Sequence, residues 1–288
     1  MSTKNLELYE GRIFFQDEDF PVWMNLDDVQ KKGNYIPLHW HEYIELHYVV
    51  KGSISIKVNN IDITALPEDL VLINSNELHS GASLEERTQA IVVIFDIKMF
   101  SRELAGRNII FQSLMKNDPY ISKLLRDIYF EYQEQQIGYQ LCCKGILMCL
   151  VSHLVRHYNL EELTNQDNLK RVKNLERLNQ TIAYIQDHFT ESLSNKKLAG
   201  MIHLSEGRFN HLFKESMEVA PQQYINRLRL KKAAELLRTE NMSISEIAYV
   251  VGFNDYNHFG RIFKRHYGCT PTQMRENKYN ENIILEKV

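Results

Sequence analysis

Cysteine is scarce in this sequence, and long apolar runs are absent. Four cysteines occur in 288 residues and none belongs to a Cys-x-x-Cys pair, so neither a disulfide framework nor a zinc ribbon is expected. The purely apolar runs, such as residues 91–95, are far too short to cross a bilayer, and no signal-peptide pattern opens the chain. These absences favour a cytoplasmic protein with reduced thiols and no membrane partner.

A large excess of either charge is also missing, because the net charge is −3. The charge is nevertheless unevenly divided along the chain. Residues 175–280 hold 15 Lys and Arg against 11 Asp and Glu, whereas the rest of the chain holds 19 against 26. A basic C-terminal part joined to an acidic N-terminal part is typical of a DNA-binding module that carries a separate sensor.

The first third of the chain has the texture of a β domain. Short β-rich runs at residues 54–58, 70–73 and 90–95 are separated by turn signals such as Lys51-Gly52 and Asn59-Asn60. Strands at roughly ten-residue spacing predict a small sandwich or barrel. We therefore expect a β domain over residues 1–110.

The middle of the chain changes to helical periodicity. Apolar residues at helical spacing predict two amphipathic helices between Pro119 and Tyr158. Residues 159–174 are mostly polar and charged, which predicts a linker and the mobile part of the molecule. We expect a helical connector with this linker over residues 111–174, a helical domain over residues 175–280, and a polar tail over residues 281–288.

The last third of the sequence contains one pattern twice, about fifty residues apart. The copies run from Leu198 to Lys214 and from Ile247 to Lys264, and each has a short apolar helix, a tight turn and a second helix that ends in Phe-Lys. This is the layout of a helix-turn-helix, whose second helix can enter a DNA major groove. Two copies, joined by a predicted continuous helix over residues 216–240, favour DNA binding over an ordinary helical bundle with solvated charges.

Capping residues mark the expected helix starts. Glu246 completes a capping box with the serine three residues before it, and Gly252 supplies the positive φ of a tight turn. The expected N-caps are Ser194, Ser205, Ser243 and Asn254. Phenylalanines at helical spacing identify the buried faces of both second helices. Asn and Arg side chains on the opposite faces can pair with base edges, and Lys and Arg can contact phosphates.

These motifs resemble the C-terminal domain of AraC/XylS transcriptional regulators. The resemblance covers about a hundred residues and rests on Phe213-Lys214, Pro221-Gln222-Gln223-Tyr224-Ile225, Arg227-Leu228-Arg229-Leu230, Ile244-Ser245-Glu246-Ile247-Ala248, Val251-Gly252-Phe253, Phe263-Lys264 and Gly268-Cys269-Thr270-Pro271. It implies two helix-turn-helix units that insert side by side into neighbouring major grooves. It also implies that the connector helices between Pro119 and Tyr158 pair two chains into a homodimer, with simple packing of these helices against the barrel as the alternative.

The resemblance places the base-reading positions. They fall on Gly207, Arg208, Asn210 and His211 in the first unit, and on Tyr256, Asn257, Gly260 and Arg261 in the second. Our predicted DNA-binding residues are Arg208, Asn210, His211, Lys214, Tyr256, Asn257, Arg261 and Lys264. The chain departs from the family at His203, where a turn glycine is common, and at Gly207, which is a poor residue early in a helix. We therefore expect the second unit to contribute much of the sequence reading.

A run of histidines precedes the strand-like segments. His39, His41, Tyr43, Glu45 and His47 stand at every second position, which predicts that they share one face of a single strand, with the apolar Trp40, Ile44, Leu46, Tyr48 and Val50 on the other face or at the strand end. In a barrel, this polar set can line the cavity while the apolar set packs outward against helices. The spacing resembles the first motif of cupin barrels, and the Pro67 to His79 segment resembles the second in part.

Three interpretations of this run compete. The first is a catalytic metal centre, for which the cupin resemblance implies the ligands His39, His41, Glu45 and His79. The second is a metal-free pocket that hydrogen-bonds a polar effector, with His39, His41, Tyr43, Glu45 and His79 as the binding residues. The third is a polar strand without any ligand. We favour the effector pocket and expect no cofactor, with a divalent metal as the alternative.

The sequence as a whole predicts an α+β multidomain protein. A cupin-like barrel is joined through a helical connector to an all-α domain with two helix-turn-helix motifs. We expect a cytoplasmic, sequence-specific transcription regulator that binds an operator and a small-molecule effector, with a sugar as the candidate class, and that contacts RNA polymerase if it activates. No catalytic residue is expected. The alternatives are a metal-dependent cupin enzyme or metal sensor fused to a DNA-binding module, and an architectural DNA-binding protein.

Overall fold

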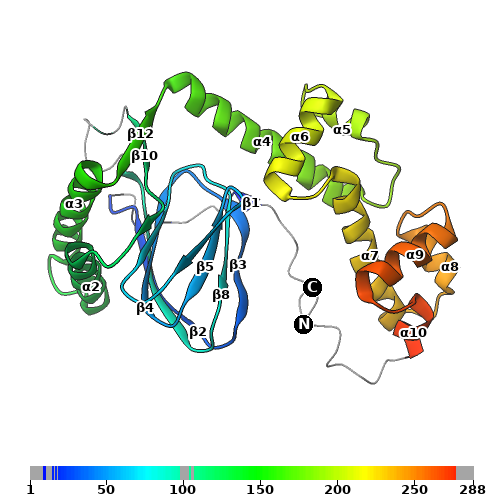
Figure 1. The fold of residues 1–288 in the computed structure, drawn as a ribbon, viewed down its shortest axis with the longest axis horizontal. Coiled ribbons are helices and arrows are strands. Elements are labelled where there is room, and N and C mark those ends of the chain that lie inside the picture. The colour runs from blue at the N-terminus through cyan, green and yellow to red at the C-terminus, as the bar shows by residue number, and fades with distance from the viewer. Residues whose placement is uncertain are drawn as a thin grey trace. The chain divides into compact units, whose positions relative to one another are not determined.

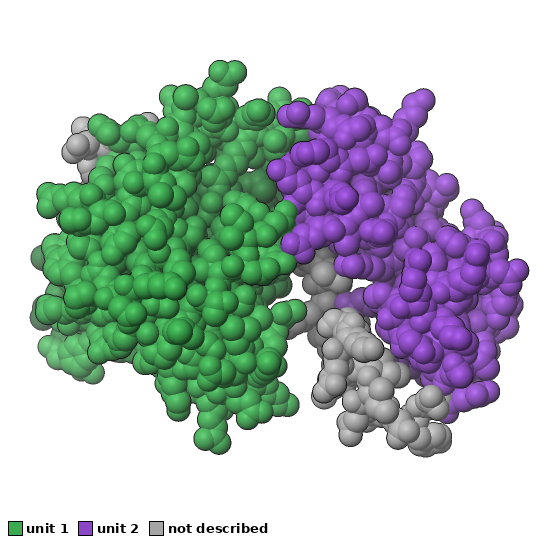
Figure 2. All heavy atoms as spheres, viewed as in Figure 1, with its two compact units in different colours: residues 1–179 green, residues 180–288 purple. Residues whose placement is uncertain are grey.

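A computed structural model of the chain describes residues 9–10, 15, 17, 19–97, 104 and 107–276. The chain divides into two compact units, residues 1–179 and residues 180–288, which Figure 2 shows in different colours. The N-terminal unit is rich in strands and the C-terminal unit is helical, as predicted. None of the helices in the described ranges combines the length and the apolar character that a bilayer crossing requires.

Two five-stranded sheets dominate the described part of the N-terminal unit (Figure 1). One has the strand order β1-β3-β8-β5-β6, and the other has the order β11-β7-β4-β9-β2. The elements are β1 (Tyr9–Glu10), β2 (Val22–Val29), β3 (Gly33–Trp40), β4 (Ile44–Lys51), β5 (Ile54–Val58), β6 (Ile61–Ala65), β7 (Leu70–Ile73), β8 (His79–Ser83), β9 (Thr88–Phe95), β10 (Asn108–Phe111), β11 (Leu114–Met115), α2 (Pro119–Glu134), α3 (Tyr139–His157) and β12 (Asn159–Leu163). The β-rich domain predicted from the short strand-like runs is therefore confirmed.

Strand β4 is buried along most of its length because both of its faces are covered. Leu46 and Tyr48 pack into one core together with residues of α2 and α3, which cover that face of the sheet. Val49 belongs to a second core that it shares with β5 and β6 of the opposite sheet. Because side chains alternate along a strand, Glu45 and His47 lie on the same face as Val49, between the two sheets. The prediction of polar residues inside and apolar residues toward the helices is confirmed for this strand.

Helix α2 begins at a cap that also joins it to α3. The Asp118 carboxylate accepts hydrogen bonds from the N–H groups of Tyr120 and Ile121 at 2.9 and 3.1 Å. Its other oxygen lies 2.8 Å from His153 Nε2 and accepts from the Tyr158 hydroxyl at 2.7 Å. Burial would raise the pKa of Asp118, but the hydrogen bonds from His153 and Tyr158 prevail and lower it to about 2.

The segment predicted to be a linker is regular secondary structure. Residues 159–163 form β12, which pairs with β10, and α4 (Asn165–His188) follows almost at once. The linker prediction for residues 159–174 is therefore wrong. The segment is polar because most of its side chains face solvent, and this exposure, rather than a lack of structure, explains its composition.

The C-terminal unit repeats a pair of helices at the two ends of one longer helix (Figure 1). Its elements are α5 (Asn195–Met201), α6 (Glu206–Met217), α7 (Pro221–Thr239), α8 (Ile244–Val250), α9 (Tyr256–Tyr267) and α10 (Pro271–Glu276). The connecting helix was predicted over residues 216–240 but begins only at Pro221, because α6 runs to Met217 and its C-cap Glu218 is left-handed with a φ of 58°. The predicted tail over residues 281–288 lies outside the described residues.

Candidate DNA-binding surface and effector site

The first helix-turn-helix unit turns through a hydrogen-bonded cap at the end of α5. The N–H of Leu204 donates to the carbonyl of Ala199 at 3.0 Å, and the N–H of His203 donates to the carbonyl of Gly200 at 3.2 Å. These two bonds define a Schellman motif, which requires a left-handed residue just after the helix. His203 fills that position with a φ of 55°.

The second unit uses the same motif at the end of α8. Phe253 donates to Ala248 and Gly252 donates to Tyr249, both at 2.9 Å. Gly252 has a φ of 96°, so the positive φ predicted for this glycine is confirmed. The histidine that replaces the turn glycine in the first unit therefore adopts the same left-handed conformation, which is costly for a residue with a Cβ.

The helices that follow the turns begin at caps of two kinds. Ser205 caps α6, as predicted. The prediction of Asn254 as the cap of α9 is wrong, because Asp255 accepts from the N–H groups of Asn257 and His258 at 2.8 and 3.2 Å. These bonds, the one from His258 foremost, lower the pKa of Asp255. The second turn is one residue longer than the first, and this extra residue moves the cap.

The capping of the two short first helices agrees with the sequence. Ser194 accepts from the N–H of Lys197 at the start of α5. Ser243 and Glu246 form the predicted capping box at the start of α8, where each side chain bonds to the backbone N–H of the other. Each helix pair is therefore started and turned by local hydrogen bonds that the sequence encodes.

Helices α6 and α9 bury the same positions, fifty residues apart. Phe209 and Phe213 of α6 correspond to Phe259 and Phe263 of α9, and all four are buried. The exposed and half-buried positions of the two helices match throughout as well. Seven of the predicted DNA-binding residues are exposed: Arg208, His211, Lys214, Tyr256, Asn257, Arg261 and Lys264. Each unit therefore presents a polar helix face with basic side chains to solvent.

Asn210 differs from the other predicted DNA-binding residues because it takes part in an internal network. It is half-buried, and its Oδ1 accepts a hydrogen bond from Asn195 Nδ2 at 2.9 Å. The Asn195 Oδ1 in turn accepts from Gln222 Nε2 at 3.0 Å. The amide of Asn210 therefore helps to hold the start of α5 against α6 and α7.

One basic residue of α7 supports the fold of the unit. Arg229 donates to the carbonyls of Phe189 and Glu191, both at 2.6 Å, and its guanidinium lies 5.6 Å from the centre of the Phe253 ring. Burial lowers the pKa of Arg229. Nothing local in the sequence signalled the contacts of Arg229 with the segment before α5 and with the second turn.

The histidine cluster of the N-terminal unit is assembled from several strands. His39 lies near the end of β3, His41 lies in the turn that follows, and Glu45 lies in β4. The prediction that this run shares one face of a single strand is therefore wrong, because the chain crosses from one sheet to the other between His41 and Glu45. His79 comes from β8, which pairs with β3 so that His39 and His79 are register partners.

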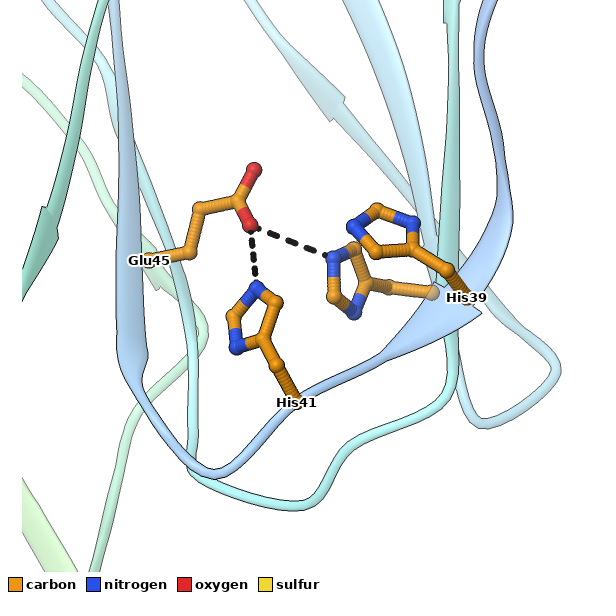
Figure 3. A group of neighbouring side chains, drawn as sticks. His39, His41 and Glu45 are labelled. Atoms are coloured by element: carbon orange, nitrogen blue, oxygen red, sulfur yellow. Dashed lines mark hydrogen bonds and ion pairs between the residues drawn. The ribbon is translucent and has the colours of Figure 1, made fainter. Parts of the chain in front are cut away.

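Glu45 is the hub of the cluster. Its Oε2 lies 2.7 Å from His41 Nε2, as Figure 3 shows, and 3.3 Å from His79 Nε2. Its Oε1 lies 2.6 Å from His47 Nε2. The contact with His79 has the distance of an ion pair but not the geometry of a hydrogen bond. All of these side chains except His39 are buried. The structure thus brings together the four residues implied by the cupin resemblance and adds His47.

The cluster shifts the acidity of its members in opposite directions. Burial, together with the neighbouring His79, lowers the pKa of His39 to about 4. Burial alone would raise the pKa of Glu45, but His47 and His79 hold it well below its usual range. Burial opposes the charged form of His79, yet the Glu45 carboxylate raises its pKa above the ordinary value. A negative carboxylate surrounded by imidazoles is the resulting arrangement.

A cavity of about 420 Å³ adjoins the cluster between the sheets. His39, Glu45 and His47 form its polar wall, and its remaining lining residues are Trp23, Asp27, Tyr35, Ile36, Pro37, Val92 and Ile94. Burial raises the pKa of both Asp27 and Tyr35. Sequence reasoning missed these two residues, because they lie on strands far from the histidine run. The predicted effector residue Tyr43 stacks at a tilt beside His41, with ring centres 5.9 Å apart.

Known protein families match both parts of the chain. Residues 29–151 match the AraC-like ligand binding domain, and residues 198–277 match a helix-turn-helix domain. The chain is similar to the HTH-type transcriptional activator RhaS of Enterobacter sp. (strain 638), with 40% identity over 102 residues, 35% of this chain and 37% of that protein. The RhaS of Klebsiella pneumoniae (strain 342) is 35% identical over 136 residues, 47% of this chain and 46% of that protein.

The matched segment thus spans less than half the length of either relative. A solved structure, the C-terminal domain of the two-component response regulator yesN from Fusobacterium nucleatum subsp. nucleatum ATCC 25586, is similar to part of the chain. It shares 33% identity and covers 33% of this chain and 94% of its own, with a TM-score of 0.33.

Proposed function

Because the chain belongs to the AraC/XylS family of transcriptional regulators, we propose that it is a sequence-specific DNA-binding regulator controlled by a small-molecule effector. Effector binding is assigned to residues 1–110 and DNA binding to residues 175–280. The relatives named above are transcriptional activators, so the proposed outcome of DNA binding is activation, with RNA polymerase as a partner.

The observation that carries this proposal is the duplicated, exposed face of α6 and α9. A helix-turn-helix places its second helix in the major groove, with side chains from the start of that helix at the base edges. Helix α7 joins the two helix-turn-helix units, and its 19 residues span about 28 Å at 1.5 Å per residue. This length approaches the repeat of one DNA turn. One chain can then read two successive grooves.

Footprinting of the full chain on its operator tests this arrangement. We expect two protected major-groove segments about one helical turn apart, within a site of roughly 20 base pairs per chain. A single protected groove segment per chain would contradict the proposal. The control is the same experiment on a random sequence, where a specific reader leaves no positioned footprint.

Two side chains of α9 separate base reading from phosphate binding. Arg261→Ala is expected to cost about 1–3 kcal/mol on the operator and to relax sequence preference at one position. Lys264→Ala is expected to weaken operator and random DNA alike and to reduce the salt dependence of binding by about one counterion. Equal losses on both DNAs for Arg261→Ala would show that this residue only touches phosphate.

We propose that the cavity beside the histidine cluster receives the effector. Its wall combines apolar and aromatic surface with the hydroxyl of Tyr35 and the carboxyls of Asp27 and Glu45, which suits a polar molecule with several hydroxyl groups, such as a sugar. The effector would act by binding one arrangement of the protein more tightly than another. A thermal-shift screen of sugars, repeated with Tyr35→Phe, tests the assignment, since a true ligand should lose its stabilising effect in the variant.

Helix α3 offers a surface for the proposed homodimer. Leu141 and Met148 are 77% and 51% exposed, and they lie seven residues apart, on one helix face with the exposed Gly145 and Ser152. Apolar residues at this spacing pair helices. Leu141→Glu is expected to convert a dimer to a monomer in sedimentation experiments while leaving the thermal unfolding of the chain unchanged. Sedimentation of the wild-type chain as a monomer would contradict the proposed dimer.

A further inference from the structure

Three histidines in the effector domain are held in the same way. His39, His41 and His79 each place Nδ1 against a backbone carbonyl two residues away, at 2.9, 3.2 and 2.8 Å. A carbonyl oxygen can only accept, so Nδ1 must carry the proton in each ring. In the neutral imidazole this leaves the lone pair on Nε2. Anchoring one ring nitrogen to a carbonyl so that the other can bind is the usual outer contact of metal-binding histidines.

The Nε2 ends of these rings converge on Glu45. One potential ligand atom from each of His39, His41, Glu45 and His79 lies within 4.8 Å of all the others. Figure 3 shows the carboxylate and the rings of His39 and His41 directed toward a common space. Nitrogen and oxygen ligands lie about 2.0–2.2 Å from a central ion. Small side-chain rotations would therefore be enough to bring these four atoms to bonding distance of one ion.

A buried polar atom in the cluster has no hydrogen-bond partner. His79 Nε2 is fully buried and makes no hydrogen bond, although the Glu45 carboxylate is 3.3 Å away. A buried polar group without a partner is costly, and native proteins leave few of them. An ion between His79 and Glu45 would supply that partner.

We propose that His39, His41, Glu45 and His79 bind one divalent first-row transition-metal ion in the effector domain. Three imidazoles and one carboxylate suit zinc, nickel, cobalt or iron, and they do not suit calcium or magnesium, which prefer all-oxygen sites. His47 positions the ligand rather than binding the ion, because its Nε2 holds Glu45 Oε1 at 2.6 Å and leaves Oε2 directed at the other three residues.

The site deepens the function proposed above, on which its regulatory meaning rests. His39 and Glu45 also line the cavity of about 420 Å³, so a bound ion would form part of the wall that an effector meets. The N-terminal unit would then respond to metal occupancy, to a small molecule that binds beside the ion, or to both through the same pocket.

Cobalt titration of the full chain tests the site. After treatment with a chelator and removal of the chelator, Co²⁺ is added and visible absorption is recorded, with elemental analysis of the dialysed protein. We expect one equivalent of bound cobalt with d–d bands and no thiolate charge-transfer band. His39→Ala should weaken binding more than about 100-fold, because removing only an outer contact of a metal site already costs 10- to 100-fold.

A second histidine pair provides the matched control. His153 and His157 lie together on α3, with ring centres 4.5 Å apart, near the exposed Cys149. His157→Ala should leave the bound equivalent of cobalt unchanged. A thiolate charge-transfer band in the wild type, or loss of binding in His157→Ala, would assign the ion to α3 and overturn the proposal. Absence of stoichiometric cobalt in the wild type would also overturn it.

Two checks keep these outcomes interpretable. His39 is only half-buried, so its replacement should preserve the fold, which the fluorescence of Trp23 and Trp40 in the same unit can verify. If the variant does not fold, the stoichiometry and the spectrum of the wild type still decide the question. Footprinting the same samples separates the two proposals. A protein that binds DNA but no cobalt would contradict only the metal site, and a protein that binds cobalt but leaves no footprint would contradict only the proposed DNA-binding function.

Discussion

Gly252 is the residue whose replacement should most damage the second helix-turn-helix unit. It ends α8 with a φ of 96°, and a Cβ at this position would lie 2.5 Å from the carbonyl oxygen of Thr190 and 2.9 Å from its carbonyl carbon. Both contacts are with backbone atoms, which cannot rotate away as the tip of a side chain can. Gly252→Ala therefore combines conformational strain with a clash.

The cost of Gly252→Ala can be assembled from these two effects. A left-handed conformation costs about 1–2 kcal/mol for a residue with a Cβ. Overpacking adds roughly 1–3 kcal/mol. We expect the free energy of unfolding of the C-terminal unit to fall by about 4 kcal/mol, which is a large part of the stability of a typical domain.

The first unit supplies the opposite experiment. His203 occupies the equivalent position with a φ of 55° and makes the same backbone hydrogen bonds. His203→Gly should relieve about 1–2 kcal/mol of strain and lose about 0.5–1 kcal/mol to the greater freedom of glycine in the unfolded chain. The expected net gain is about 0.5–1 kcal/mol.

The assay exploits the position of the tryptophans. The chain has two, Trp23 and Trp40, and both lie in the N-terminal unit. Urea unfolding followed in parallel by ellipticity at 222 nm and by tryptophan fluorescence separates the units, because a change confined to ellipticity belongs to the C-terminal helices. Gly252→Ala should shift the ellipticity transition and leave the fluorescence transition in place.

A glycine without these constraints is the control for Gly252→Ala. Gly207 lies in α6, and a Cβ there would have no atom within 4 Å. Gly207→Ala should raise stability by about 0.5–1 kcal/mol through helix propensity alone. The reasoning is refuted if Gly252→Ala remains within about 0.5 kcal/mol of the wild type, or if the two alanine variants behave alike.

Three further predictions concern single side chains. Asp118→Ala should lower the free energy of unfolding by on the order of 2 kcal/mol at neutral pH, because the helix cap and its charged hydrogen bonds are lost. The folded pKa of Asp118 is lowered to about 2, so this stabilisation is present above about pH 4 and disappears as the pH falls toward 2. Urea unfolding of both proteins at several pH values would show this dependence. Asn257→Ala should weaken operator binding by about 1–3 kcal/mol. Asn210→Ala should weaken it clearly less, because the Asn210 amide already accepts a hydrogen bond from Asn195. Equal losses of affinity in a gel-shift titration would contradict this difference. Arg229→Ala should lower the stability of the C-terminal unit by about 2 kcal/mol, and Arg229→Lys should recover less than half, because lysine cannot donate to two carbonyls in the same fork; full recovery would show that only the charge matters.

The DNA-binding half of the fold was predictable because its signals are local. The capping box of Ser243 and Glu246, the left-handed Gly252 and the phenylalanine spacing act within one or two turns of helix. The errors were also local and small. Asp255 replaces Asn254 as a cap because the second turn has one more residue, and α7 begins at Pro221 because Glu218 ends α6 in the left-handed conformation.

The effector domain was harder to predict because its site depends on contacts between distant strands. Alternation from His39 to His47 is compatible with one strand, and no local signal shows that the chain changes sheets after Trp40. Asp27 and Tyr35 reach the same cavity only through the pairing of sheets. The polar segment over residues 159–174 was misjudged for a related reason, since β12 depends on a partner strand fifty residues earlier in the chain.

The two copies of the helix-turn-helix differ in how they use nearly the same burial pattern. In the first copy, the left-handed turn position holds a histidine and the second position of α6 is a glycine. In addition, the Asn210 side chain accepts a hydrogen bond from Asn195. In the second, the turn has its glycine, and Asn257 and Arg261 are exposed. Because the first copy offers fewer side chains to base edges but keeps Arg208 and Lys214 exposed, its contribution should come mainly from phosphate contacts, and sequence discrimination should depend on α9.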